Sequence, residues 1–312
     1  MAMKSTVTSS SPPKKRRDTT DSAIRARRQA LPGRVRAWIM GLVSDHMHTR
    51  LRYYRAFKRF PNLRRPRTFN EKICYRKLNP QPAYTTLSDK VAVRDYVAQK
   101  IGAQYLIPCH GVTQKLTPEM YEALPAQFVM KGNHGSGYNL LVHNKSDHGF
   151  AELAATGHHW LGQDFYRESR EIHYQPIVAQ LMFEALLFDE AGKVPRDFKF
   201  HCFRGADGAR VVYIEVIQDR FTNYRESLYT RDWQPIATDG EATGPAAPRP
   251  PQLEKAVALA LELAEDFSYV RVDFYLPGES IYFGELTFTP DAGFMRFHHP
   301  ETDRHWGTLF DV

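Results

Sequence analysis

Residues 269–288 constrain the fold most strongly, because they predict two β-strands joined by a short turn. Apolar residues at 270, 272, 274 and 276 alternate with Arg271, Asp273 and Tyr275, and a second alternating run follows from residue 282 to residue 288. Alternation with period two is typical of strands that bury one face. With Tyr282, Gly284, Leu286 and Phe288 on the core face, the expected pairs are Val272–Leu286, Phe274–Gly284, Asp273–Glu285 and Arg271–Thr287.

This register places two carboxylates opposite each other. Facing like charges on a strand pair cost about 0.2–1 kcal/mol. A cation between Asp273 and Glu285 would remove that cost, and Mg²⁺ prefers such hard oxygen ligands. The alternative is an ordinary solvated strand face on which Arg271 neutralises Asp273. The alternation alone leaves both interpretations open.

Two lysines stand where they could meet a polyphosphate. Lys131 ends a predicted strand and leads into a loop with glycines at 132, 135 and 137. Glycines let backbone amides approach phosphate oxygens, and lysine adds a point charge. Lys199 lies on a predicted strand between Phe198 and Phe200. Each lysine also has a plain interpretation, the first in a glycine-rich hairpin turn and the second as a surface partner of Asp197.

The remaining pattern mixes helices with antiparallel strands and predicts the α+β class. A helix is expected from an N-cap at Ser88 to Gly102. Two further helices are expected over residues 150–161 and 252–267. Strands are expected over 105–109, 127–131, 139–143, 177–183, 197–203 and 210–217.

Charge is distributed very unevenly along the chain. Residues 1–69 hold 18 Lys and Arg against 3 Asp and Glu, whereas the other 243 residues hold 24 against 32. A protein that is basic throughout is therefore excluded, and nucleic acid is an unlikely partner. We expect a disordered basic tail over residues 1–33 and a basic amphipathic helical segment over 34–65.

The segment over 34–65 has two possible roles, peripheral contact with an anionic membrane or packing against the main domain. No apolar run approaches the roughly 20 residues of a membrane-spanning helix. Three widely spaced cysteines and the lack of a secretory signal favour a cytoplasmic protein. If the segment contacts a membrane, we expect the contact at the inner face of the cell membrane.

Several motifs together resemble one known family. They are Pro66–Lys72, Ser88-Asp89-Lys90, Pro195–Phe200, Cys202–Gly205 and Phe283–Thr287, in this order. The chain from about residue 50 to residue 305 resembles the teichuronopeptide-biosynthesis (TupA-like) family of the ATP-grasp superfamily. The resemblance implies an ATP-grasp catalytic domain over residues 66–312, with two α+β lobes at about 84–180 and 184–312 that clasp Mg-ATP.

The resemblance also implies roles for individual residues. Lys131 and Lys199 would hold ATP phosphates, with amides near Gly135, Ser136 and Gly137. Leu181 and Met182 would read adenine through their backbone, and Glu184 would contact the ribose. Gln180 stands where a glutamate is frequent before this hinge. Asp273 and Glu285 would bind Mg²⁺ and Arg271 would stabilise the transferring group, while Thr287 replaces a common asparagine at the metal site.

The implied activity is an ATP-dependent carboxylate–amine ligase that works through an acyl phosphate. The family suggests that an amino acid or amine is joined to a uronic acid of a surface polysaccharide. An ATP-grasp kinase or sugar-modifying transferase is the alternative, and a non-enzymatic binding protein for nucleic acid or anionic polymer is a third. The basic stretch at 294–306 either faces an anionic substrate or is a solvated surface.

Overall fold

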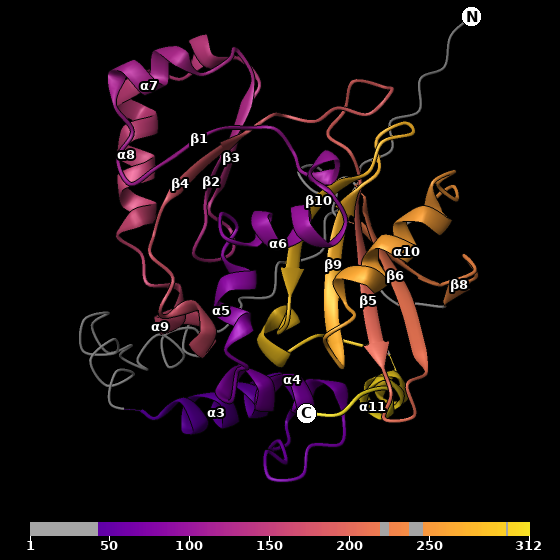
Figure 1. The fold of residues 1–312 in the computed structure, drawn as a ribbon. Coiled ribbons are helices and arrows are strands. Elements are labelled where there is room, and N and C mark those ends of the chain that lie inside the picture. The colour runs from indigo at the N-terminus through magenta and orange to yellow at the C-terminus, as the bar shows by residue number, and fades with distance from the viewer. Residues whose placement is uncertain (1–42, 219–224, 237–245, 298) are drawn as a thin grey trace, which may run out of the picture. The chain divides into compact units, whose positions relative to one another are not determined.

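The computed structural model describes residues 43–218, 225–236, 246–297 and 299–312 (Figure 1). Residues Asp45–Val312 form one compact unit, built on two antiparallel sheets. The predicted tail at 1–33 and the apolar positions 35–42 of the predicted amphipathic segment lie outside the described residues.

The smaller sheet has four strands in the order β1-β4-β2-β3. Their bounds are β1 Cys109–Thr113, β2 Phe128–Gly132, β3 Asn139–Val142 and β4 Leu181–Glu184. Helices α7 (Pro118–Ala123) and α8 (Phe150–Leu161) flank this sheet in Figure 1. Buried apolar side chains of the sheet and α8, among them Phe128, Leu153 and Phe183, form its core.

The larger sheet has six strands in the order β10-β9-β5-β6-β7-β8. Their bounds are β5 Asp197–Arg204, β6 Arg210–Gln218, β7 Arg225–Thr230, β8 Pro235–Ile236, β9 Tyr269–Tyr275 and β10 Tyr282–Thr287. One face packs on α10 (Leu253–Leu263) through fully buried residues such as Phe200, Val272 and Ala260. This face is the main hydrophobic core of the protein.

The opposite face carries an aromatic cluster at one end. This cluster of Phe69, Tyr269, Trp306 and Phe310 closes that end, and it is carried partly by α4 (Phe69–Leu78) and α11 (Pro300–Thr308). Helix α4 starts with a capping box in which Thr68 and Glu71 satisfy each other's backbone amides. Lys199, Glu215 and Arg271, in the middle of this face, line a pocket.

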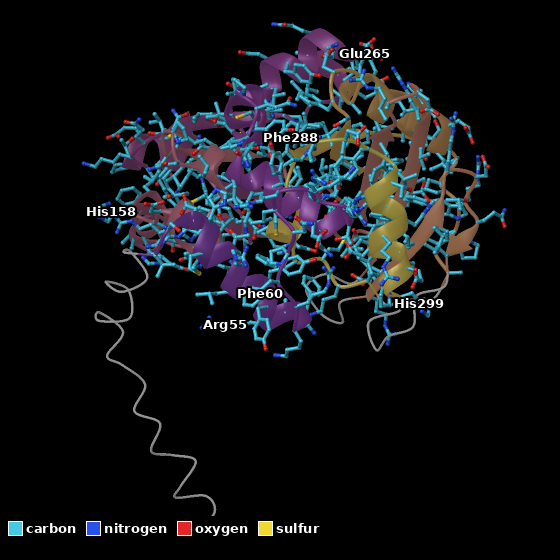
Figure 2. All side chains as sticks on the ribbon, turned by 90° about the horizontal axis from the view of Figure 1, so that it is seen from below. Arg55, Phe60, His158, Glu265, Phe288 and His299 are labelled. Atoms are coloured by element: carbon cyan, nitrogen blue, oxygen red, sulfur yellow. The ribbon has the colours of Figure 1, made fainter. Side chains whose placement is uncertain are left out.

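The remaining short elements connect these layers. They are α3 Asp45–Phe57, α5 Ala83–Ser88, α6 Val93–Lys100, α9 Phe165–Ser169 and the 3-10 turns η1 Ala103–Tyr105, η2 Lys145–Asp147, η3 Ile172–Tyr174 and η4 Pro290–Gly293. Figure 2 shows Phe288, which is fully buried, and Arg55 and Phe60, which both carry exposed side chains.

Three local predictions were wrong. Ser88 is the last residue of α5 and not an N-cap; Asp89 accepts hydrogen bonds from the amides of Val91 and Ala92 and separates α5 from α6. The strand expected at 105–109 begins only at Cys109, because residues 103–105 form a 3-10 turn. The strand expected at 177–183 begins at Leu181, since the backbone of Gln180 already bonds Asn133.

The hairpin at 269–288 has the expected pairs Asp273–Glu285, Val272–Leu286 and Arg271–Thr287. Phe274, however, pairs with Phe283 and not with Gly284, because β10 carries a bulge between Phe283 and Glu285. The bulge brings Phe283 into the core, where it is 4% exposed. The predicted α+β class and the strands near 128–132, 139–142, 197–204 and 210–218 are confirmed.

Candidate active site

A row of charged residues crosses the larger sheet. Strand pairing places Glu285 opposite Asp273, Asp273 opposite Lys199, and Lys199 opposite Glu215. Residues opposite each other in antiparallel strands share a face, so all four side chains stand on the face that α10 does not cover. The row continues into Leu228 and Ile236 at the far edge of the sheet.

Arg271 holds the acidic end of this row together. Its Nε and Nη2 donate to the two oxygens of Asp273 at 2.8 Å each. Nη2 also lies 3.1 Å from Oε1 of Glu285 and 3.1 Å from Oγ1 of Thr287. The arginine thus neutralises Asp273, as one of the two sequence interpretations expected, and it also touches both other predicted metal ligands.

Lys199 and His201 surround the other acid of the row. Lys199 Nζ lies 3.7 Å from Glu215 Oε1, and His201 Nε2 lies 3.2 Å from Glu215 Oε2. The other ring nitrogen of His201 contacts the hydroxyl of Tyr269 at 2.9 Å. Lys199 therefore pairs with Glu215 and not with Asp197, the partner named in the plain interpretation of the sequence.

Burial and neighbouring charges set the pKa of Asp273 apart from the pKa values of Glu285 and Glu215. Burial raises the pKa of Asp273 to about 7, Asp197 and Glu285 adding to the rise and Arg271 opposing it. Burial also raises the pKa of Glu285, but Lys90, Arg271 and Lys199 outweigh it and lower that pKa to about 2. The pKa of Glu215 is likewise lowered to about 2, with Lys199 and His201 outweighing burial.

The glycine loop joins β2 to β3 and presents free amides. The N–H of Gly132 donates to the carbonyl of Tyr138 at 2.8 Å and closes the hairpin. Gly137 has a φ of +84°, which favours glycine. Among the described residues, none accepts a hydrogen bond from the amides of Gly135, Ser136 or Gly137. Such free N–H groups can bind phosphate oxygens.

Lys90 connects this loop to the larger sheet. Its Nζ donates to the carbonyl of Gly135 at 2.6 Å and lies 3.8 Å from Oε2 of Glu285. Burial lowers the pKa of Lys90, against the opposing charge of Glu285. Lys90 belongs to the motif Ser88-Asp89-Lys90, for which the family resemblance implied no role of this lysine. Its position beside the free amides makes it a third candidate phosphate ligand.

Lys131 stands next to this group on β2. Its Nζ lies 2.7 Å from Oε2 of Glu184, whose Oε1 lies 2.9 Å from Arg94. Glu184 is 5% exposed and held by two cations at the end of β4. The structure thus brings Lys90, Lys131 and Glu184 together, while Lys199 and Arg271 stand on the larger sheet.

The residues predicted to contact adenine lie within a paired strand. Leu181 and Met182 lie inside β4, which is paired with β1 on one side and β2 on the other. Both side chains are buried, and both peptide groups are engaged in the sheet. Leu186 and Leu187, beyond the strand, have no backbone hydrogen bond to another described residue. The peptide groups of Leu186 and Leu187 are therefore open towards a ligand, whereas those of Leu181 and Met182 are engaged in the sheet.

The donor set at Asp273 and Glu285 is small. The described residues contain no group of three or more His, Cys, Asp and Glu side chains that could hold a metal ion. Two facing carboxylates and the hydroxyl of Thr287, which lies 3.2 Å from Glu285, nevertheless offer three oxygen donors. Mg²⁺ at a nucleotide is often bound by one or two carboxylates together with phosphates and water. The residues present fit such an ion.

Comparison with known proteins gives the family. A model described as TupA-like ATP-grasp matches residues 71–311. The chain belongs to the TupA-like ATP-grasp family. The ATP-grasp superfamily consists in general of ATP-dependent carboxylate–amine ligases, and the family match confirms the resemblance found in the motifs. No curated protein matches the sequence.

Solved ATP-grasp structures match the TupA-like chain at low identity. D-Alanine–D-alanine ligase from Helicobacter pylori is 11% identical, with 72% of this chain and 61% of that chain covered and a TM-score of 0.43. The ATP complex of D-alanine–D-alanine ligase from Bacillus anthracis is 15% identical over 66% and 56%, with a TM-score of 0.41.

N5-carboxyaminoimidazole ribonucleotide synthetase from Thermus thermophilus is 16% identical, over 67% of this chain and 47% of that chain, with a TM-score of 0.40. The TupA-like chain thus spans about half of the length of these structures.

In the described part of the chain, no helix combines the length and apolar character that a bilayer crossing requires.

Proposed function

We propose that this protein is an ATP-dependent carboxylate–amine ligase. The observation that carries the proposal is the charged row of the larger sheet. It holds Asp273 and Glu285 for Mg²⁺ and Lys199 for a transferring phosphoryl group. Arg271 lies against both acids, and Lys90 links the row to the free amides of the glycine loop. These are the parts that phosphoryl transfer needs, because catalysis there rests on positioning and charge stabilisation.

In the first step, an oxygen of the substrate carboxylate attacks the γ-phosphorus of ATP. The bond from that phosphorus to the bridging oxygen breaks, its electron pair leaves with ADP, and an acyl phosphate forms. Lys90, Lys131 and the amides of the glycine loop hold the phosphates, and Lys199 and Arg271 offset the charge on the transferring oxygens. Asp273, Glu285 and Thr287 would hold Mg²⁺, which would neutralise further phosphate charge.

In the second step, a neutral amine attacks the acyl carbon. The carbon–oxygen bond to phosphate breaks, inorganic phosphate leaves with the electron pair, and the phosphate takes up the proton that the nitrogen loses as the amide forms. No nucleophile from the protein is required. Adenine would meet the backbone after Glu184, and Glu184 itself would reach the ribose or order Lys131.

We infer from the family resemblance that the carboxylate belongs to a uronic acid of a surface polysaccharide or its precursor, and that the amine is an amino acid or another small amine. Such precursors are made in the cytoplasm, which is where we place the protein. The charged row itself does not distinguish one sugar from another.

ATP turnover with Mg²⁺ tests the proposal, using uronic acids with amines and mass detection of the product. We expect ADP, free phosphate and a new amide. Removing one preorganised charge typically costs about 10²–10³-fold in turnover, so Lys131→Ala and Lys199→Ala should each slow the reaction by that factor. Lys193→Ala removes a lysine from an exposed loop and is the matched control.

Two results would contradict the ligase. Near-normal ATP consumption by both variants would remove the phosphate-binding roles of Lys131 and Lys199. A phosphorylated sugar in place of an amide would show a kinase or transferase on the same ATP-grasp site.

Helix α3 supports the proposed contact with an anionic membrane. Met47, Leu51 and Tyr54 are spaced four and three residues apart, share one face, and are 40–49% exposed. Phe60 stacks on Tyr54 with ring centroids 4.9 Å apart and is 53% exposed. Arginines at 50 and 55 flank this apolar face. Exposed apolar side chains framed by basic ones are typical of helices that lie in a membrane interface.

Vesicle binding by the full chain tests this surface. The chain should bind phosphatidylcholine vesicles that contain phosphatidylserine, and Leu51→Ser with Phe60→Ser should weaken binding about tenfold, the effect of roughly 1.4 kcal/mol. Val312→Ser, at another exposed apolar residue, is the control. Equal binding by the double variant and the native chain would remove the membrane role of this surface.

A further inference from the structure

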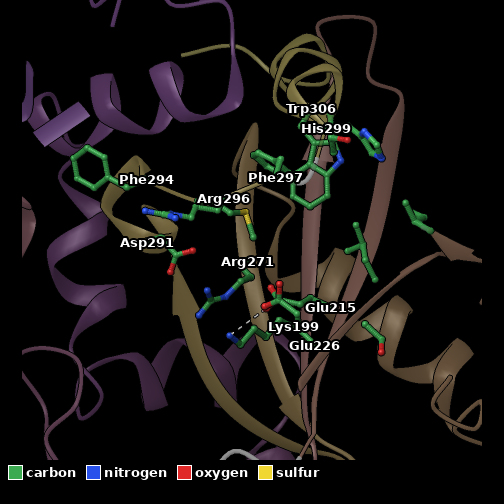
Figure 3. Close-up of a pocket in the computed structure, with 15 residues that line it drawn as sticks. Lys199, Glu215, Glu226, Arg271, Asp291, Phe294, Arg296, Phe297, His299 and Trp306 are labelled. Carbon is green, nitrogen blue, oxygen red and sulfur yellow. Dashed lines mark ion pairs between the residues drawn. The ribbon is translucent and has the colours of Figure 1, made fainter. Parts of the chain in front are cut away.

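A pocket opens beside the proposed phosphoryl-transfer site. Its volume is about 340 Å³, and Lys199, Glu215 and Arg271 form its floor (Figure 3). Strand β7, the chain after β10 and helix α11 supply the walls. Because Arg271 touches Asp273 and also lines this pocket, a ligand here would lie next to the transferring phosphoryl group. Small-molecule pockets range over about 300–1,000 Å³, so this pocket fits one small molecule better than a polymer segment.

One wall of the pocket is a backbone turn of unusual conformation. Asp291, Ala292 and Gly293 follow each other with φ values of +49°, +53° and +81°. Left-handed conformation costs non-glycine residues about 1–2 kcal/mol each. Such strain persists where the surroundings fix the backbone, and it clusters at functional sites.

Helix α4 fixes this turn. Lys77, which is fully buried, donates from Nζ to the carbonyl of Ala292 at 3.0 Å. The side-chain amide of Asn70 donates to the carbonyl of Met295 and accepts from its N–H, both at 2.9 Å. A Cβ on Gly293 would lie 2.6 Å from Sγ of Cys74, so the turn approaches α4 as closely as glycine allows.

The fixed turn presents two opposite charges to the pocket. Asp291 and Arg296 both line it, and both are exposed. Among the described residues, none forms an ion pair or a side-chain hydrogen bond with the Asp291 carboxylate or the Arg296 guanidinium. A carboxylate and a guanidinium, five positions apart, thus have no partner among the described residues, and α4 keeps the backbone between them in place.

The three aromatic side chains that line the pocket already have partners, the Phe294 ring centroid lying 4.7 Å from the Arg52 guanidinium and 4.4 Å from Lys77 Nζ. Trp306 is 1% exposed and stacks on Tyr213 with centroids 5.0 Å apart. Phe297 meets Phe69 and Trp306 edge to face. Rings in these positions fill the core and do not offer an open face for stacking on a sugar, so the charged groups dominate recognition.

We propose that this pocket binds the amine substrate as a zwitterionic α-amino acid, with Asp291 facing its ammonium group and Arg296 its carboxylate. The proposal rests on the ligase function and narrows its second substrate from amines in general to amino acids. Arg296 would bind the carboxylate that stays free in the product. Asp291 would orient the nitrogen next to Arg271, where the acyl phosphate forms, and the ammonium group would give up one proton to water before the neutral amine attacks.

Direct binding to the full chain, measured by calorimetry without ATP, tests this assignment. The probes are the common α-amino acids in both enantiomers, each compared with the amine that lacks its carboxylate and the acid that lacks its amine. At least one amino acid should bind, and at least about tenfold more tightly than either analogue. A hydrogen bond to a charged group contributes about 1.5–3 kcal/mol, equal to roughly 10–100-fold in affinity.

The variants separate the two contacts. Arg296→Gln should weaken binding of that amino acid about 10–100-fold and leave its decarboxylated amine unaffected, while Asp291→Asn should weaken both. Arg304→Gln, at an exposed arginine of α11 that pairs with Glu301, is the matched control. Asparagine tolerates the left-handed conformation, so the Asp291 variant keeps the turn.

Three outcomes would overturn the assignment. These are binding of none of the amino acids, equal affinity for an amino acid and its decarboxylated amine, and unchanged affinity in both variants. Because no ATP is present, amino-acid binding by a chain that turns over no ATP would sustain this inference while the ligase proposal fails. ATP turnover with simple amines and no amino-acid binding would show the reverse.

Discussion

The two faces of the six-stranded sheet use the same strands for different purposes. On β5, Phe200 is completely buried against the core around α10, while its neighbour Lys199 stands on the other face beside Glu215. The side chains of the apolar face stabilise the core through their shape and volume. The charged face contains groups that repel, compete for Arg271 and gain from a ligand. Along a single strand, residues that stabilise the core therefore alternate with residues that form the proposed active site.

Truncating the apolar face gives the largest expected effect. Phe200→Ala should lower the free energy of unfolding by about 3–5 kcal/mol, because it removes a buried ring and leaves a cavity. Phe200 also packs edge to face on Phe274, with centroids 5.7 Å apart. Denaturant unfolding measures the loss, with Phe200→Leu as the volume-conserving control.

Turnover per folded molecule should stay within a few-fold of the native value in the Phe200 variant. Lys199→Ala should show the opposite profile, with turnover lost before stability. If Phe200→Ala abolished turnover in the folded fraction, the separation between the two faces would not hold.

Acid should affect the charged face before the apolar one. Glu215 has its pKa lowered to about 2 from the ordinary value of 4.5, burial being outweighed by Lys199 and His201. Its carboxylate therefore contributes stability above pH 4.5, and this contribution is lost as the pH falls towards 2. At 1.36 kcal/mol for each pKa unit, the loss amounts to at most about 3 kcal/mol.

Unfolding measured between pH 5 and pH 2 tests this contribution, using roughly half-unit steps across the titration range of a carboxyl group. Glu215→Gln should have a flatter stability profile over that range than the native chain. Glu301→Gln, at an exposed acid of α11, should keep the native slope. Equal slopes in the native chain and the Glu215 variant would show that the charged face adds no acid-sensitive stability.

The sequence predicted the parts of the fold that follow from alternation. Strands such as β5 and β6 and the facing pair Asp273–Glu285 could be expected, because burying one face fixes the register. The bulge at Gly284 could not, since an extra residue changes the phase of the pattern without changing the residue types. Ser88 misled for a related reason, because it and Asp89 are both good capping residues and only the structure shows that Asp89 accepts from the amides of Val91 and Ala92 in the turn before α6.

The site residues also divide into those that a strand pattern predicts and those that depend on contacts between distant segments. Lys131 and Lys199 were predicted because each lies on a predicted strand, and the structure places them on β2 and β5. Lys90 had no role assigned, since it lies in a turn 45 positions before the Gly135 carbonyl that it contacts. Asp291 gave no signal in the sequence, and Arg296 appeared only as one member of a basic stretch. Their common place in the pocket depends on a left-handed turn that α4 holds, and the contact of α4 with this turn joins residues more than 200 positions apart.

The bulge at Gly284 has a consequence for how relatives of this chain should be compared. Gly284 is the one residue of β10 that has no partner on β9, with Phe283 and Glu285 on either side both paired. In evolutionary terms it behaves as a single-residue insertion that the ladder absorbs. A relative without it would show uninterrupted alternation through this strand and would still place its two acids face to face. Alignments here should therefore allow a gap next to the acid, because forcing equal lengths would exchange the core and active-site positions of every residue before it.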